Sequence, residues 1–235
     1  MRILALDTST ECCSAALLMD SNLAGRELDL GLRAAEHILS MIDGLLAETG
    51  LALGALDAIA FGRGPGGFTG VRLAASVAQG LAFGAGLPVV PVSDLRAVAQ
   101  RALESDAAIE RVIVCNDARM QEVYWGCFER GPDGLAVTVG EEKVGKPGTV
   151  GIPADWSSAV GVGRGFAAYP ELRERIGDRL SGILEQLFPR AHEIARLAVP
   201  IVRSGGAVPP EEAIPVYLRD DVARPPAETT PGSRN

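Results

Sequence analysis

A glycine-rich run that joins a predicted strand to a predicted helix constrains the fold more than any other feature of the chain. Leu56 to Phe61 has the composition of a buried strand, the run Gly62-Arg-Gly-Pro-Gly-Gly-Phe-Thr-Gly70 follows it, and residues 71–83 predict a helix rich in small side chains. A strand over 87–92 and a helix that begins after Ser93, a suitable N-cap, repeat the alternation. Strands that alternate with helices indicate a parallel α/β unit.

Further elements lie on both sides of this unit. Residues 2–8 and 13–19 predict a hairpin, a third strand is expected after Asn22, and residues 33–49 have helical periodicity. Polar residues 104–110 mark a candidate domain boundary. Beyond this boundary we expect strands at 111–116, 122–129, within 135–144 and at 159–162, and helices at 170–176 and 191–202.

The charge of the chain argues against direct binding to nucleic acid. The 235 residues have a formal net charge of -8, and Lys143 and Lys146 are the only lysines. Such a chain gains little from the release of counterions on a phosphate backbone. A role close to RNA would therefore need a partner.

The sequence also predicts a cytoplasmic location. Asp7 interrupts the first apolar run, so no signal peptide is predicted, and no stretch reaches the roughly 18 apolar residues of a membrane span. The cysteines lack the spacing of metal ligands, so we expect buried, reduced thiols. They are Cys12, Cys13, Cys115 and Cys127.

Two segments are candidates for binding a nucleotide, and no metal site is predicted. Gly62, Gly64 and Gly67 match a dinucleotide-binding pattern, although Pro65 removes one amide donor from the loop. An acidic and hydroxyl turn at the end of the first strand could hold a Mg-phosphate, or it is a turn capped by short polar side chains. The weak cofactor-binding candidates are Asp7, Thr8, Gly64, Gly66 and Gly67. His37 and His192 each stand alone on a predicted helix, so neither has a predicted catalytic role.

The helix over 33–49 carries two apolar rows offset by about 100° of helix rotation, which is wider than the stripe that one core requires. Either one row faces another chain, or the helix is sandwiched inside its own domain. The rows are Ala34, Ile38, Met41, Leu45 and Ala35, Leu39, Ile42, Leu46.

Four segments in order resemble the TsaB (YeaZ) family: Ile3-Leu-Ala-Leu-Asp-Thr-Ser-Thr10, the run from Gly62 to Arg72, Asp117-Ala-Arg-Met-Gln-Glu-Val-Tyr-Trp125, and Pro215-Val-Tyr-Leu-Arg219. The resemblance implies the ASKHA fold of actin and Hsp70, an α/β fold with two RNase H-like lobes and mixed sheets. It implies one lobe from residues 1–103 plus 191–223, which includes a returning C-terminal helix, and a smaller lobe from 104–190. We expect residues 224–235 to be disordered.

The resemblance also implies a function in making threonylcarbamoyladenosine, the modified adenosine next to the anticodon of tRNAs that read ANN codons. The catalytic paralogue TsaD carries a metal-binding HxxxH motif, and the matching positions here are Asp94 and Val98, which cannot replace two imidazoles. The family usually has a histidine at the position of Ala34, whereas His37 follows one turn later.

The expected protein is a non-catalytic scaffold that heterodimerises with TsaD through its first two helices, recruits a TsaE-like ATPase and reaches tRNA only through the complex. No cofactor is expected to bind tightly, although ATP or ADP could sit at the interface of the complex, and the chain alone could form a homodimer. The expected partner interface includes Ile38, Met41, Ile42, Leu45, Val71 and Gln79.

Two rival functions come from the enzyme class. An ATP-dependent phosphotransferase would use Asp7, Thr8 and the glycine-rich loop, with 161–165 as the only candidate for a second nucleotide-binding loop. A metallopeptidase is disfavoured because the HxxxH motif is absent.

Overall fold

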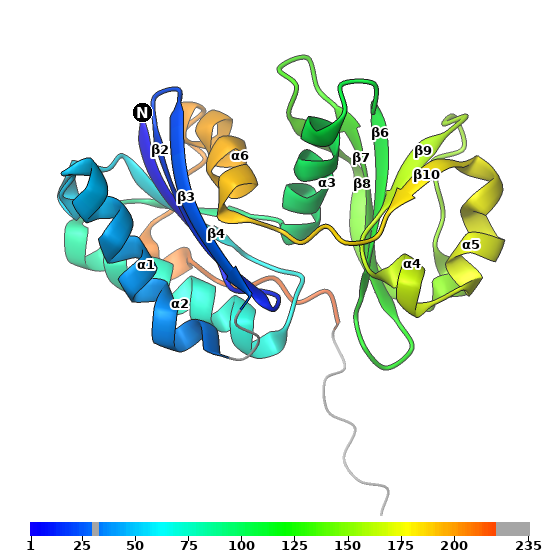
Figure 1. Ribbon diagram of the computed structural model, residues 1–235, viewed down its shortest axis with the longest axis horizontal. Coiled ribbons are helices and arrows are strands. Elements are labelled where there is room, and N and C mark those ends of the chain that lie inside the picture. Colours follow the sequence, from blue (N-terminus) through cyan, green and yellow to red (C-terminus); the bar gives the residue numbers. More distant parts are fainter. Residues whose placement is uncertain (30–32, 220–235) are drawn as a thin grey trace, which may run out of the picture.

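The computed structural model describes residues 1–29 and 33–219, and Figure 1 shows that they form two lobes side by side. The expected disordered tail at 224–235 lies outside the described residues, as do residues 220–223 of the expected first lobe.

The first lobe contains a five-stranded mixed sheet in the order β3-β2-β1-β4-β5. The first three strands form an antiparallel meander, and β4 and β5 continue the sheet in parallel with β1. The bounds are β1 Arg2–Asp7, β2 Cys12–Met19, β3 Asn22–Asp29, β4 Ala58–Gly62 and β5 Val89–Val92.

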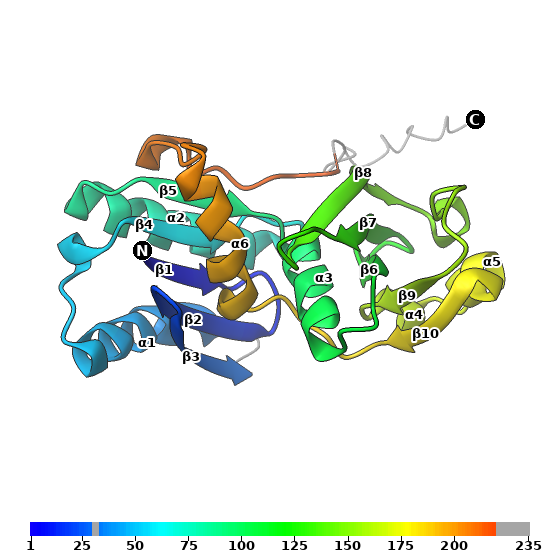
Figure 2. The same ribbon diagram turned by 90° about the horizontal axis from the view of Figure 1, so that it is seen from above.

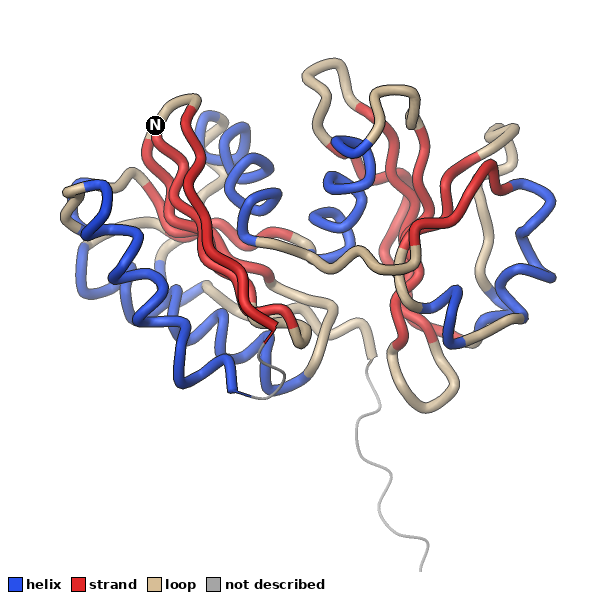
Figure 3. The backbone as a smooth tube through the Cα atoms, in the orientation of Figure 1, coloured by secondary structure: helices blue, strands red, loops and turns tan. Residues whose placement is uncertain are grey.

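Helices cover both faces of this sheet (Figure 3). Helices α1 (Ala34–Thr49) and α2 (Phe68–Ala85) lie on one face, and α6 (Ala191–Arg203) lies on the other. Strand β1 serves both cores, because successive side chains point to opposite faces: Leu4 packs with α1 and α2, and Ile3 packs with α6. This arrangement explains why the first strand is apolar at almost every position.

The second lobe repeats the topology of the first. Its sheet has the order β10-β9-β6-β7-β8, again an antiparallel meander of three strands extended by two parallel strands. The bounds are β6 Arg111–Asp117, β7 Val123–Arg130, β8 Ala136–Gly145, β9 Ala159–Val162 and β10 Leu180–Leu184; α4 covers Gly165–Ala168 and α5 covers Glu171–Ile176. Two lobes with one topology confirm the expected fold.

Helices α3 and α6 lie next to each other between the two sheets (Figure 2). Helix α3 (Asp94–Ser105) follows the first lobe in sequence, and the side chain of Ser93 caps it by accepting a hydrogen bond from the Arg96 N–H at 3.2 Å, as predicted. Its apolar face, however, packs against the second sheet through residues such as Val98 and Leu103. Ala97 of the same helix packs in the core of the first lobe, so α3 contacts both lobes, and the expected boundary after residue 103 stays a prediction. Helix α6 packs in the first lobe.

Local sequence patterns do not predict strand β10. It is short and only half-buried, so its sequence lacks both the alternation of a surface strand and the long apolar run of a buried one.

The cysteines agree with the prediction of reduced thiols, because none of the four forms a disulfide. Cys13, Cys115 and Cys127 are buried, and Cys12 is partly exposed.

Candidate functional site at the junction of the lobes

The turn after β1 lies against the glycine-rich loop, but its polar groups bind the protein itself. Asp7 is fully buried, and its Oδ1 accepts hydrogen bonds from the Ser9 N–H at 3.0 Å and the Ser9 hydroxyl at 3.1 Å. The Thr8 hydroxyl donates to the Gly70 carbonyl at 2.7 Å. The hydroxyl groups predicted for a Mg-phosphate are therefore engaged in holding two loops together.

Two amides of the glycine-rich loop also bind acceptors of the chain. The Gly64 N–H donates to Asp94 Oδ2 at 2.7 Å, and the Gly67 N–H donates to the Ser9 carbonyl at 2.7 Å. From the other side, the Val216 N–H donates to the Arg63 carbonyl at 2.8 Å. A phosphate site at a helix N-terminus needs amides that point at the ligand, and these amides point at acceptors of the chain.

Close packing explains the glycines of this loop. A Cβ added at Gly66 would approach the Ser9 carbonyl oxygen to 2.8 Å, and one added at Gly70 would overlap with the Thr8 carbonyl. The structure thus brings the five cofactor-binding candidates together, from Asp7 to Gly67, but as two loops packed on each other.

A pair of buried carboxyl groups forms the centre of the junction. Asp94, the first residue of α3, is 1% exposed, and a Cβ added at Gly62 would overlap with both Asp94 Oδ1 and Asp7 Oδ2. Neither of these two oxygens has a hydrogen-bond donor within residues 1–29 and 33–219. Burial raises the pKa of Asp7 to about 6, and burial together with the charge of Asp7 raises the pKa of Asp94 well above its usual range. A proton held between the two oxygens would give each of them a hydrogen-bond partner.

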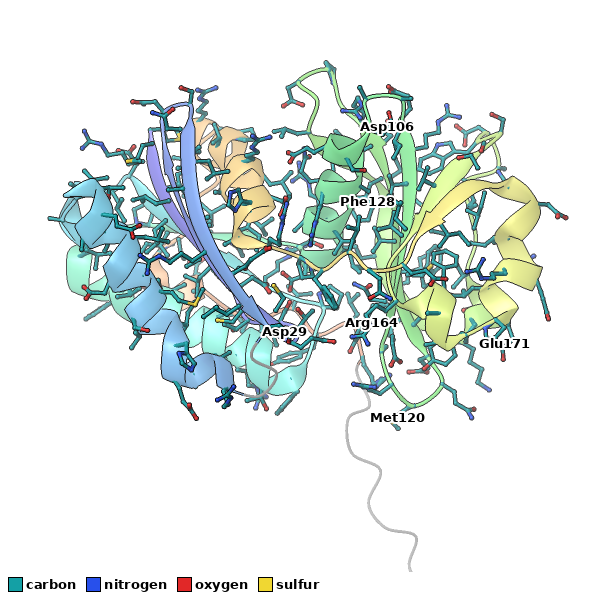
Figure 4. The ribbon with its side chains drawn as sticks, viewed as in Figure 1. Asp29, Asp106, Met120, Phe128, Arg164 and Glu171 are labelled. Atoms are coloured by element: carbon teal, nitrogen blue, oxygen red, sulfur yellow. The ribbon has the colours of Figure 1, made fainter. Side chains whose placement is uncertain are left out.

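Polar contacts attach this pair to the second lobe through α3. Ser93 hydrogen-bonds Glu142 of β8, whose pKa is raised by burial, and the Arg96 Nε–H donates to the Ala136 carbonyl at 2.6 Å. Figure 4 shows Arg164 on the side of the second lobe that faces the first, where it forms an ion pair with Glu11. Hydrogen bonds and an ion pair therefore join the two lobes around the carboxyl pair.

The positions that match the TsaD metal motif do not form a metal site here. Asp94 is part of the carboxyl pair, and Val98 is fully buried in the apolar core of the second lobe. Within the described part of the chain, no group of three or more His, Cys, Asp and Glu side chains is placed to hold a metal ion.

The structure buries the α1 residues of the expected partner interface. They come from both apolar rows, and Ile38, Met41, Ile42 and Leu45 are at most 4% exposed because they pack inside the first lobe. Val71 is buried in the same lobe and Gln79 is half-buried. The outward row of α1 instead presents Leu39, which is 55% exposed, and neighbouring α2 presents Phe83, which is 79% exposed.

Comparison with known proteins assigns the family. A family model described as "TsaD: tRNA N6-adenosine threonylcarbamoyltransferase" matches residues 33–155, more than half of the chain. The protein named "tRNA threonylcarbamoyladenosine biosynthesis protein TsaB" in Escherichia coli K12 is 40% identical over 228 residues, which cover 95% of this chain and 96% of the relative. The chain belongs to the TsaB (YeaZ) family.

Two further TsaB-family proteins agree with this assignment. The TsaB protein of Haemophilus influenzae is 41% identical over 232 residues, covering 94% of this chain and 95% of its own length. The solved structure described as "YeaZ from Pseudomonas aeruginosa" superimposes with a TM-score of 0.85 at 44% identity, covering 92% of this chain and 99% of that chain. The family is one of threonylcarbamoyladenosine biosynthesis. Among the described residues, no helix is long and apolar enough to cross a membrane.

Proposed function

We propose that this TsaB-family chain is a non-catalytic subunit that binds a TsaD-type transferase and holds it in a competent geometry for modifying the adenosine next to the anticodon of tRNAs that read ANN codons. A TsaE-type ATPase would join the same complex. The names of the relatives support the pathway, and the surface of the first two helices supports the partner.

The outer face of α2 carries the main argument. A Cβ added at Gly80 or Gly84 would meet nothing within 4 Å in the described structure. Each glycine inside a helix costs about 1 kcal/mol relative to alanine, and the isolated chain offers no packing reason for either one. With Ser76, they form a stripe of small residues four positions apart, which lets another helix approach closely.

Exposed apolar side chains lie on the same two helices. Phe83 is next to the stripe on α2, and Leu39 is exposed on α1, which packs next to α2 on the outer face of the first lobe (Figure 1). Exposed large apolar side chains beside a stripe of small residues are typical of an interface between protein chains. We therefore move the proposed interface from the buried row of α1 to Leu39, Ser76, Gly80, Phe83 and Gly84.

The junction of the lobes supports the absence of catalysis by the isolated chain. The Gly64 and Gly67 amides and the Thr8 hydroxyl already bind acceptors of the chain. ATP or ADP would therefore be held where the two subunits meet. Calorimetric titration of the isolated chain with Mg-ATP, and a gel-shift titration with tRNA, are both expected to show no binding; tight binding of either ligand would contradict the proposal.

Two substitutions on α2 test the interface. Gly80→Leu would block close approach and Phe83→Asp would place a charge in an apolar contact, so each should weaken binding to the TsaD-type partner by at least about tenfold. The matched control is Val137→Asp, at an exposed apolar residue on β8 of the other lobe. Binding is measured by calorimetry with the purified partner. Equal affinity for the wild type and both α2 variants would refute this interface.

A further inference from the structure

The edge strand β10 lacks the charged residues and the proline that the other sheet edges carry in the described part of the chain, and its pairing with β9 is irregular only between Leu180 and Gly182. Edge strands usually carry charges or proline, because their free backbone groups can pair with another chain. Strand β5 contains Pro91 and is bridged by Val208. Charged side chains lie on β3 (Arg26, Glu27, Asp29) and on β8 (Glu141, Glu142, Lys143), whereas β10 reads Leu180-Ser-Gly-Ile-Leu184.

A hollow flanks β10 on each face of the sheet. The first, of about 700 Å³, lies beside α5 and is lined by Leu180, Ile183 and Arg173. The second, of about 740 Å³, lies beside the segment that follows α3 and is lined by Leu184, Asp106 and Glu129, among others. Residues 181–183 line both hollows. Leu180 lines only the first hollow and packs with the α5 core, whereas Leu184 lines only the second and packs with the α3 core, so the two hollows lie on opposite faces.

This geometry matches an added strand. Successive side chains of an extended peptide point to opposite faces of a sheet, so a peptide paired with β10 would place alternate side chains in the two hollows. Backbone hydrogen bonds then supply affinity, and the hollows supply specificity. Ser181 and Gly182 are exposed, and a Cβ added at Gly182 would meet nothing within 4 Å in the described structure, so the chain leaves this approach open.

The charges differ between the hollows. The second hollow is lined by three carboxylates, those of Asp106, Glu110 and Glu129. Arg130 forms an ion pair with Glu110 at 3.5 Å, and Arg111 lies over the ring of Trp156. Asp106 and Glu129 form no ion pair among the described residues, so the three carboxylates outnumber the two guanidinium groups in this hollow. In the first hollow, Arg173 and Glu185 neutralise each other beside the apolar side chains of Leu180 and Ile183.

We propose that β10 binds an extended segment of a protein partner, with apolar side chains directed into the hollow beside α5 and lysine or arginine side chains directed into the hollow beside Asp106. The site lies on the second lobe, on the far side of the molecule from α1 and α2 (Figures 1 and 2). A chain bound at this edge therefore leaves the proposed TsaD-binding face free, and the two sites can be tested separately.

The variant Gly182→Lys places a charge on the edge, as the protected strands do, and the space around Gly182 accepts the side chain. The matched control is Gly54→Lys on the first lobe, where an added Cβ also has no neighbour within 4 Å among the described residues. Both variants should melt at the temperature of the wild type.

The probe is the fluorescently labelled peptide acetyl-Thr-Lys-Val-Lys-Val-Lys-Thr-amide, and its partner probe has glutamate in place of lysine. Fluorescence anisotropy with the full chain is expected to show saturable binding of the lysine peptide and at least about tenfold weaker binding of the glutamate peptide. Gly182→Lys should bind the lysine peptide with at least about tenfold lower affinity than the wild type, and Gly54→Lys should bind it with the affinity of the wild type.

Three results would overturn the proposal. The first is no saturable binding of the lysine peptide to the wild type. The second is equal binding by the wild type and Gly182→Lys. The third is a concentration-dependent dimer, seen by analytical ultracentrifugation, that Gly182→Lys alone abolishes; the edge would then bind a second copy of this chain.

Discussion

The buried pair of Asp7 and Asp94 predicts an unusual dependence of stability on pH. The pKa of Asp7 is raised from 3.8 to about 6 by burial, so the folded state keeps a proton that the unfolded chain has already released. The contribution of Asp7 to stability is therefore most favourable below pH ~4, decreases as the pH rises towards about 6, and stays reduced above it. Each pKa unit corresponds to about 1.4 kcal/mol, so Asp7 lowers the free energy of unfolding by about 3 kcal/mol at neutral pH.

The variant Asp7→Asn removes this contribution with little change in shape. The oxygen of the introduced amide can still accept from the Ser9 N–H, and its nitrogen can donate to Asp94 Oδ1, which has no donor in the described structure. At pH 7.5 we expect the free energy of unfolding to increase by about 3 kcal/mol, which for a chain of this size raises the melting temperature by roughly 6–12 °C. Near pH 3.5 the variant and the wild type should melt at similar temperatures.

Thermal unfolding followed by circular dichroism between pH 3.5 and pH 8 measures this difference. Asp43→Asn, at an exposed residue of α1, is the control and should follow the wild type throughout. Infrared spectroscopy supplies an independent readout, because the wild type at neutral pH should show the carbonyl band of a protonated, buried carboxylic acid that Asp94→Asn lacks. A destabilised Asp7→Asn protein at pH 7.5, or a difference that does not change with pH, would refute the shared proton.

Two further predictions concern packing in the first lobe. Leu45→Ala should lower the free energy of unfolding by about 2–5 kcal/mol because it empties a core position, whereas Leu39→Ala on the outward row should change it by less than about 0.5 kcal/mol; urea denaturation distinguishes the rows, and equal losses would contradict the orientation of α1. Gly70→Ala should destabilise the chain because its Cβ would overlap with the Thr8 carbonyl, whereas Gly80→Ala should stabilise it by about 1 kcal/mol; loss of stability in both variants would show that Gly80 is needed by the isolated fold.

Local patterns were sufficient for most of the elements. The alternation of apolar strands and helices predicted the parallel unit from β4 to α3, and Ser93 predicted the start of α3, because these features depend on residues close in sequence. Helical periodicity revealed two apolar rows on α1 but did not show which one faces the sheet. The α1 residues expected at the partner interface came from both rows, and all four of them are buried because that side of the helix packs against the first sheet.

The sequence did not predict the pairing of the two carboxyl groups or the edge position of β10. Asp7 ends the first strand and Asp94 begins the third long helix, and only the meeting of β1, the glycine-rich loop and α3 brings their oxygens together. Similarly, the hollows beside β10 are formed by segments that come from both ends of the second lobe.

The sequence by itself determined the family, the α/β class and the order of most strands and helices, because motifs and periodicity are properties of neighbouring residues. The tertiary structure decided what the candidate residues do. The loop with a nucleotide-binding pattern packs against the turn after β1. Helix α3 packs against the second sheet, and Gly80 and Gly84 lie on the exposed face of α2. These outcomes depend on contacts between segments far apart in the chain, because those contacts determine which side chains are buried and which groups form hydrogen bonds.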